Sequence, residues 1–177
     1  MITYLQGDAT KPQDKDKDRS KIVAHVCNDI GAWGRGFVLS LTKEYPSAET
    51  NYRNWYQMNP GWCNEPELVP FRLGRMKLVR VSNEVFVANM IAQHGIFDKD
   101  GVPPIRYEAL GDCLAELALH AKALDASIHM PRIGCGLAGG KWSEVEKVIN
   151  THLGDLDVSV YDFTAENGDA RVIKWCP

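Results

Sequence analysis

The chain of 177 residues is long enough to bury the core of one domain, which we expect to span residues 1–177. Its formal net charge of −3, with 45% hydrophobic and 24% charged residues, argues against broad binding to nucleic acid or to anionic membrane. Because no apolar run approaches a membrane span and the first residues form a strand pattern rather than a signal peptide, we expect a cytoplasmic protein with no membrane partner.

The N-terminal part predicts two strands that each end in a polar or glycine-rich loop. A short strand at 2–6 is followed by Gly-Asp-Ala-Thr at 7–10, and the charged stretch 11–19 is typical of an exposed loop. The strand at 21–27 is almost continuously apolar, as expected in a sheet that is covered on both faces. A glycine cluster at 31–36 then leads into the start of an apolar helix.

The middle of the chain predicts three helices and a pair of strands. Pro46 should end the first helix, and Ser47 is in place to cap the second. Residues 72–81 and 84–91 are typical of two strands joined by a tight turn at Ser82-Asn83. The clearest helix follows, with one apolar stripe at Leu110, Leu114, Leu117, Ala121 and Leu124.

The last third contains a second glycine-rich stretch, at 130–142, between a short apolar strand and a helix. Ser143 and Glu146 form an S-x-x-E capping-box pattern, which predicts that this helix starts at Ser143. Two further strands are expected at 158–163 and 172–175.

Strands that alternate with helices predict a three-layer α/β/α fold with a mixed, mostly parallel central sheet. Ligands of such folds bind at the carboxyl ends of the strands, and both glycine clusters lie at such ends. Each cluster leads into a helix, so free backbone N–H groups and the positive end of a helix dipole are directed toward one place. The sequence therefore predicts a phosphate or other anion site, with a glycine-rich turn that binds nothing as the alternative.

Two known phosphate-binding patterns fit the second glycine cluster poorly. Residues 134–139 match G-x-G-x-x-G, and Asp162 is near the position of the acid that follows it in dinucleotide folds. Only 38 residues follow Gly139, however, which is too few to complete a dinucleotide-binding half. The Walker A pattern also fails, because Cys135 replaces a required glycine and Trp142 replaces the magnesium-binding Ser or Thr.

Three residues in these clusters have both a functional and a structural interpretation. Trp33 could cover a ligand ring or belong to the core, and Arg35 could pair with a phosphate or be solvated. Cys135 could be a reactive thiol, although a small residue that fits a tight loop is favoured. The cysteines as a set contain no C-x-x-C pair, so free thiols are expected at Cys27, Cys63, Cys113, Cys135 and Cys176.

Three more residues lie in or directly after the first two strands. Asp8 could accept from a ligand amine or hydroxyl, or it could be a turn residue. Asn28 could bond a sugar hydroxyl or its own turn. His25 lies inside its strand, where a histidine is more often a buried core residue than a catalyst.

Taken in order, these pieces resemble the macrodomain family, the ADP-ribose-binding module. The resemblance covers about residues 1–164 and rests on 7–10, Asn28, Gly31–Gly36 into Phe37, 131–137 followed by Trp142, and 160–163. The 131–137 run and the spacing of His25, Asn28 and Trp33 are similar to one branch. That branch includes yeast-type ADP-ribose-1″-phosphate phosphatases and hydrolases that remove terminal ADP-ribose from glutamate.

The resemblance implies a crevice for ADP-ribose or a derivative, free or attached to a macromolecule, with no metal and no cofactor. Asp8 would bind the adenine amine, Phe163 would border the adenine, and Asn28 would contact the distal ribose. The two glycine loops would wrap the pyrophosphate and that ribose. The implied ligand-binding residues are Asp8, Ala9, Asn28, Trp33, Gly34, Arg35, Gly36, Phe37, Ile133, Gly134, Cys135, Gly136, Leu137, Ala138 and Phe163.

The resemblance also implies hydrolysis of ADP-ribose-1″-phosphate or of an ADP-ribosyl ester. The glutamate-specific hydrolases use a lysine that attacks the distal ribose and an aspartate in the glycine loop, but Gln93 and Ala138 stand at these positions here. His25 is therefore the candidate acid/base, with Asp29 as the nearest acidic partner. The missing lysine and aspartate leave a non-catalytic ADP-ribose-binding module as the alternative.

Overall fold

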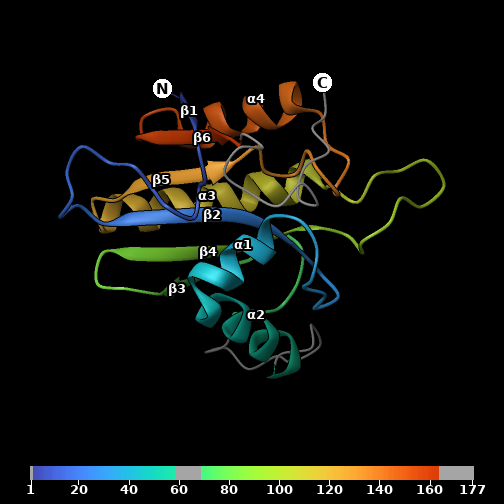
Figure 1. Ribbon diagram of the computed structural model, residues 1–177. Coiled ribbons are helices and arrows are strands. Elements are labelled where there is room, and N and C mark those ends of the chain that lie inside the picture. The colour runs from blue at the N-terminus through green and yellow to red at the C-terminus, as the bar shows by residue number, and fades with distance from the viewer. Residues whose placement is uncertain (1, 59–68, 164–177) are drawn as a thin grey trace.

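The structure is a computed structural model that describes residues 2–58 and 69–163 (Figure 1). The predicted strand at 172–175, Cys63 and Cys176 lie outside the described residues. The elements follow in the order β1 (Ile2–Gln6), β2 (Lys21–Asn28), α1 (Phe37–Glu44), α2 (Pro46–Met58), β3 (Met76–Arg80), β4 (Val85–Gln93), α3 (Tyr107–Ala123), β5 (Ser127–Pro131), α4 (Trp142–Leu153) and β6 (Val158–Asp162).

One sheet organises the described residues. Its strand order is β1-β6-β5-β2-β4-β3, with β3 antiparallel to β4 and the other neighbouring pairs parallel. The prediction of a mixed, mostly parallel sheet is therefore confirmed. Because β1, β6, β5, β2 and β4 are parallel, their carboxyl ends lie at a single edge, which Figure 1 shows on the right for β5, β2 and β4. We call this the carboxyl edge.

Side chains of the central strand β2 alternate between two helix layers. Ile22 and Ala24 pack in the core cluster that includes α3 and α4, whereas Val23 and Cys27 belong to clusters with α1 and α2. Figure 1 shows α1 and α2 in front of the sheet and α3 behind it. This double burial explains why β2 is almost continuously apolar, and each fully buried Ile or Val contributes roughly 1.5–3 kcal/mol. The three-layer α/β/α fold is confirmed.

Two local predictions for the middle of the chain also hold. The predicted stripe of α3 is buried from Leu110 to Ala121, with Leu124 partly buried just after the helix. β3 and β4 pair across a turn in which the amides of Val81 and Ser82 donate to the Val85 carbonyl. β3 starts at Met76, later than predicted.

Helix α2 starts two residues earlier than its sequence pattern predicts, since a cap at Ser47 places the first helical residue at Ala48. It begins at Pro46, so Ser47 lies inside the first turn instead of capping the helix. Proline suits this first position because its fixed φ is helical and it lacks an N–H that would have no helical partner.

Helix α4 begins at Trp142, and the predicted capping box is wrong. The N-cap residue Lys141 makes no side-chain capping bond, and Glu146 accepts a hydrogen bond from the Tyr4 hydroxyl instead of reaching back to the helix start. The Trp142 indole donates to the same hydroxyl at 3.1 Å and lies 5.0 Å from the Arg132 guanidinium. These tertiary contacts fix the first residue of α4 where a local pattern points to Ser143.

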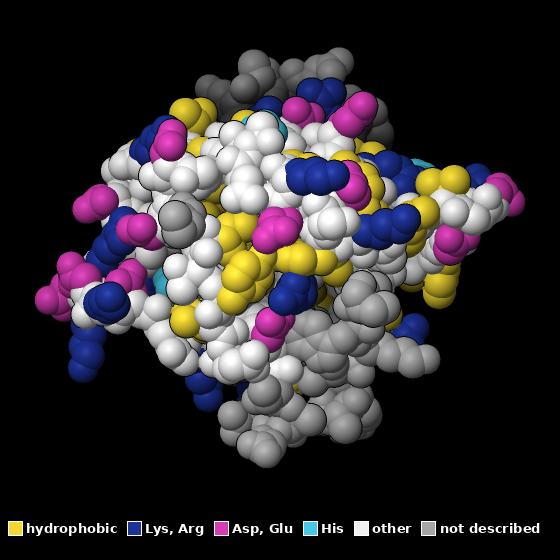
Figure 2. All heavy atoms as spheres, turned by 90° about the horizontal axis from the view of Figure 1, so that it is seen from above, with side chains coloured by type: hydrophobic (Ala, Val, Ile, Leu, Met, Phe, Trp, Pro, Cys, Tyr) yellow, Lys and Arg dark blue, Asp and Glu magenta, His cyan; other side chains and the backbone are white. Residues whose placement is uncertain are grey.

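Some general properties of the described residues bear on the expectations from composition. None of the helices in ranges 2–58 and 69–163 is long and apolar enough to cross a membrane. In the same ranges, no group of three or more His, Cys, Asp or Glu side chains is arranged to hold a metal ion. Cys27 and Cys113 are buried free thiols. The face seen in Figure 2 carries Lys and Arg intermixed with Asp and Glu, as a small net charge predicts.

Candidate functional site

Loops from five parallel strands meet along the carboxyl edge. In sheet order from β1 to β4, these loops start at Gly7, Phe163, Arg132, Asp29 and His94. With one exception, every residue predicted to bind or act on a ligand lies in one of these loops, at the end of β2 or at the start of α1. The exception is His25, which lies inside β2.

The Asn28 side chain shapes the loop that follows β2. Its Oδ1 accepts from the amides of Ile30, at 3.2 Å, and Ala32, at 2.9 Å, while its Nδ2 donates to the Ala32 carbonyl at 2.6 Å. The Tyr52 hydroxyl donates to the Asn28 carbonyl at 2.6 Å. Asn28 is 8% exposed, so it holds its own turn and leaves only a small surface for a sugar hydroxyl.

Trp33, a residue of this loop, is partly buried and packs against two clusters of the core. Its ring lies 5.3 Å from the rings of both His25 and Tyr52, and its indole N–H donates to Thr42 at 2.8 Å. Arg53 donates to the Trp33 carbonyl at 2.9 Å, which ties the loop to α2. The structural interpretation of Trp33 is thus the one that its contacts support.

The first glycine cluster presents unpaired amides at the start of α1. Gly36 is the N-cap residue with φ of 76°, a conformation that favours glycine, and no side chain caps the helix. Within the described residues, the amides of Phe37 and Val38 donate to no protein acceptor. Such amides, together with the helix dipole, suit an anion. Arg35 is exposed beside them.

The second glycine cluster forms a tight loop with a closed base and open amides at its tip. The Gly140 amide donates to the Gly134 carbonyl at 2.8 Å, and a Cβ at position 140 would lie 2.5 Å from that oxygen, so glycine is required there. In the part of the chain that the structure describes, the amides of Gly136, Leu137 and Ala138 donate to no protein acceptor. This tip can therefore donate to a ligand.

The two glycine loops approach each other across the carboxyl edge. A Cβ built on Gly36 would lie 3.4 Å from Cδ1 of Leu137, a residue that is 58% exposed. The second loop therefore reaches the N-terminus of α1 through its Leu137 side chain, next to the open amides of Phe37 and Val38. This convergence is the arrangement that the sequence predicts for an anion site.

The loops that follow β1 and β6 at the carboxyl edge carry polar side chains, and some of their oxygen atoms already accept hydrogen bonds from other residues of the chain. Asp8 accepts from the amide and hydroxyl of Thr10 at 2.9 and 2.8 Å through Oδ1, while Oδ2 accepts from none of the described residues. Asp162 is held by a bidentate pair with Arg132 at 2.6 and 2.9 Å, so it is committed to structure. Ala9 is buried, and Phe163 is partly buried directly after β6.

His25 is buried below the site. It is 2% exposed, and its Nε2 lies 2.6 Å from Oδ1 of Asn89. Burial lowers the pKa of His25 to about 4, with a smaller opposing effect of the bond to Asn89, so the ring is neutral near pH 7. Its role as acid/base remains a prediction. Asp29, proposed from sequence as its partner, bonds a different histidine.

That histidine is His94, which sequence reasoning missed. Its Nδ1 lies 2.7 Å from Oδ2 of Asp29, and Oδ1 of Asp29 accepts from the Gly95 amide at 2.8 Å. The pairing could have been found from the alignment of two strand ends, because Asn28 and Gln93 are register partners of the parallel strands β2 and β4. One further residue along each chain brings Asp29 and His94 together.

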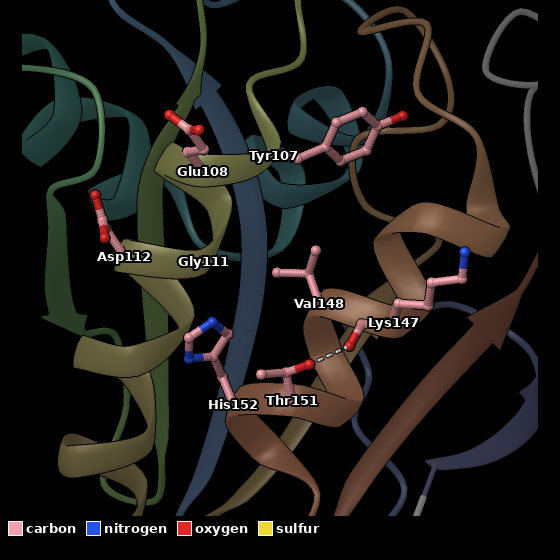
Figure 3. Close-up of a pocket in the computed structure, with 8 residues that line it drawn as sticks. All are labelled: Tyr107, Glu108, Gly111, Asp112, Lys147, Val148, Thr151 and His152. Carbon is pink, nitrogen blue, oxygen red and sulfur yellow. Dashed lines mark hydrogen bonds between the residues drawn. The ribbon is translucent and has the colours of Figure 1, made fainter.

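A groove of about 480 Å³ between α3 and α4 lies outside this site (Figure 3). Figure 3 shows Glu108 and Asp112 on α3 and Lys147 and His152 on α4 around it. No residue predicted to bind the ligand lines this groove.

Solved structures resemble the chain over nearly its whole length. A protein of unknown function from Bacteroides thetaiotaomicron is 48% identical, with a TM-score of 0.82 over 92% of this chain and 98% of that one. A macrodomain protein from Streptomyces coelicolor is 44% identical, with a TM-score of 0.75 over 92% and 99%. No family model matches the chain.

Two curated proteins show more distant similarity. The mouse chromodomain-helicase-DNA-binding protein 1-like is 32% identical over 173 residues, which are 96% of this chain. The chain spans only 18% of the length of that protein. An ADP-ribose 1″-phosphate phosphatase from Lodderomyces elongisporus is 25% identical over 171 residues, which cover 90% of this chain and 97% of the phosphatase.

Proposed function

This chain belongs to the macrodomain family, and from that premise we propose that it binds ADP-ribose and hydrolyses a derivative of it at the distal ribose. One observation carries the proposal: two glycine loops, each with open amides, meet across the carboxyl edge between Gly36 and Leu137. A pyrophosphate between them would accept hydrogen bonds from the second loop and from the N-terminus of α1. We also propose that residues 1–177 form one macrodomain.

The strand order supports an extended pose for the ligand. Asp8 and Phe163, which follow β1 and β6, would contact the adenine through the open Oδ2 and the aromatic ring. The loops after β5 and β2 would hold the pyrophosphate, with Arg35 available as a cationic partner. The distal ribose would then lie beyond Asn28, toward β4. Four strand intervals of ~4.8 Å give about 19 Å for this path.

The proposed substrates carry a leaving group on the distal ribose. ADP-ribose-1″-phosphate is supported by the similarity to a phosphatase of that name over 90% of this chain. An ADP-ribosyl ester on a macromolecule offers the same bond to hydrolyse. We propose that the reaction needs no metal and that the protein is cytoplasmic, where the buried thiols of Cys27 and Cys113 would stay reduced.

The second candidate is a module that binds ADP-ribose without turnover. It is favoured by Ala138, which is 5% exposed where an acid would be needed, and by Gln93, whose amide donates to the Gly95 carbonyl at 2.9 Å. The deep burial of His25 points the same way. Binding is common to both candidates.

Calorimetry with ADP-ribose, AMP and NAD tests the shared claim. We expect saturable binding of ADP-ribose, tighter than that of AMP, because AMP lacks the second phosphate and the distal ribose and cannot span both loops. Absence of binding at millimolar ADP-ribose would contradict the proposal. Release of phosphate from ADP-ribose-1″-phosphate, and of ADP-ribose from a glutamate-linked peptide, separates the enzyme from the module. Turnover that EDTA abolishes would overturn the metal-independent mechanism.

A further inference from the structure

We propose that His94 is the catalytic base of this site and that Asp29 positions it. The inference rests on the proposed function, because it assigns a role at the distal ribose of the same ligand. It is carried by the geometry of two residues that are 65 positions apart in sequence and adjacent in space.

The pair has the form of an oriented imidazole with one free nitrogen. Asp29 is itself fixed in place, because its backbone amide donates to the Gln93 carbonyl at 3.0 Å and its Oδ1 accepts from the Gly95 amide at 2.8 Å. Its Oδ2, 2.7 Å from Nδ1 of His94, favours the tautomer with hydrogen on Nδ1. The Asp29 side chain is 17% exposed and that of His94 is 56% exposed. Nε2 of His94 is thus left with its lone pair available to a ligand.

The position of the pair matches the reactive end of the ligand. β1 and β4 lie at opposite ends of the five parallel strands, with β6, β5 and β2 between them. If the adenine lies by Asp8 and the pyrophosphate between the glycine loops, the distal ribose lies at the ends of β2 and β4. Asp29 and His94 directly follow these two strands. No other His–carboxylate pair occurs within 4 Å among the described residues.

The loop that carries His94 is braced against the second glycine loop. The His94 amide donates to the Pro104 carbonyl at 2.8 Å, and the Ile105 amide donates to the Ala138 carbonyl at 3.0 Å. Arg106 fixes the end of this loop further by donating to the carbonyls of Pro103 and Pro104 at 2.6 and 3.1 Å. Such bracing holds His94 in one orientation relative to a bound ribose, and a fixed orientation of the catalytic group favours catalysis.

The chemical step balances without a metal or a covalent intermediate. A water molecule bound at Nε2 attacks C1″ of the distal ribose, and the new C1″–O bond forms as the bond from C1″ to the acceptor oxygen breaks. The electron pair of the broken bond leaves with the acceptor carboxylate or phosphate. Nε2 of His94 takes the proton from the attacking water and later releases it to solvent, while Asp29 stabilises the transient imidazolium. The products are ADP-ribose and the free acceptor.

The test compares His94→Ala with His120→Ala, a partly buried histidine at the end of α3. We expect His94→Ala to lower kcat roughly 100- to 10,000-fold, with KM and the Kd of ADP-ribose changed by less than about threefold. Imidazole added to the buffer should restore part of the activity of His94→Ala, because the site is open to solvent. His120→Ala should keep the wild-type rate.

Asp29→Asn tests the positioning role. It should lower kcat about tenfold or more at nearly unchanged KM. Asparagine has one acceptor oxygen instead of two, and it carries no negative charge to stabilise the imidazolium of His94. Its melting temperature should stay close to that of the wild type.

The outcomes separate this inference from the proposed function. A wild-type rate in His94→Ala overturns the inference, and so does a wild-type protein that binds ADP-ribose but turns over neither the phosphate nor the ester. A loss of activity that imidazole does not restore, together with lost ADP-ribose binding, would make His94 a structural residue. If wild-type protein binds no ADP-ribose, the proposed function fails.

Discussion

Nδ1 of His129 and the Tyr161 hydroxyl lie 2.9 Å apart inside the molecule, in a chain of hydrogen bonds whose direction can be assigned. Ser127 donates to the Asp14 carboxylate at 2.5 Å, so its oxygen accepts from Nε2–H of His129 at 2.8 Å. Nδ1 then accepts from Tyr161, whose oxygen accepts from the Gln13 amide at 2.8 Å. These hydrogen bonds fasten the loop between β1 and β2 to the sheet.

Removing the Tyr161 hydroxyl should destabilise the protein. In Tyr161→Phe, Nδ1 of His129 and the Gln13 amide both lose their partner, which we expect to cost about 1–3 kcal/mol of unfolding free energy. Urea denaturation measures this loss. Tyr45→Phe is the control, since the Tyr45 hydroxyl bonds none of the described residues, and it should change stability by less than about 0.5 kcal/mol. Equal effects of the two variants would contradict the assigned network.

Two buried histidines should make stability fall on acidification. Burial lowers the pKa of both His25 and His129 to about 4, against about 6.5 for an unfolded chain. Between these values the unfolded state binds more protons, so the unfolding free energy should decrease as pH falls from about 6.5 toward 4, by roughly 3 kcal/mol per histidine at most. Protonated His129 could also no longer accept from Tyr161.

Urea midpoints measured from pH 7.5 to 4.5 check this dependence. Above pH 7 both histidines are neutral in the folded and in the unfolded chain. Their full contribution to the unfolding free energy is then present, and it should not change with pH. In His25→Gln the slope below pH 6.5 should become shallower, because one titrating group is removed. An unchanged slope would show that His25 is not buried as described.

The fold was largely predictable because its signals are local and redundant. The stripe from Leu110 to Ala121 repeats over several turns, and the apolar run of β2 follows from burial on both faces. The glycine loops were placed correctly for the same reason, since each lies between a strand and a helix. Their meeting at Gly36 and Leu137 needs only the general rule that parallel strands end at one edge.

The errors have a common cause in contacts between distant residues. The start of α4 is fixed by the packing of Trp142 on Tyr4 and Arg132, which no S-x-x-E pattern can reveal. The pairing of Asp29 with His94 depends on the register of β2 against β4, a property of the assembled sheet. Sequence proximity instead suggested His25 as the partner of Asp29.

A carboxylate placed at Gly136 should abolish ADP-ribose binding while leaving the fold intact. A Cβ at this position would meet no atom within 4 Å, so the folded structure has room for a side chain. Gly136→Glu would nevertheless place a negative charge and bulk beside the open amides that we assign to the pyrophosphate. Calorimetry should detect no ADP-ribose binding at millimolar ligand, while the melting temperature stays within a few degrees of wild type.

The matched control for this variant is Ala115→Glu, on the exposed face of α3. It adds the same charge away from the carboxyl edge, so it should bind ADP-ribose as the wild type does. If Gly136→Glu keeps wild-type affinity, the second glycine loop does not hold the pyrophosphate. If Gly136→Glu unfolds, the open space at this position is wrongly described, and Gly136→Ala, whose single added carbon should be tolerated, would test that point directly.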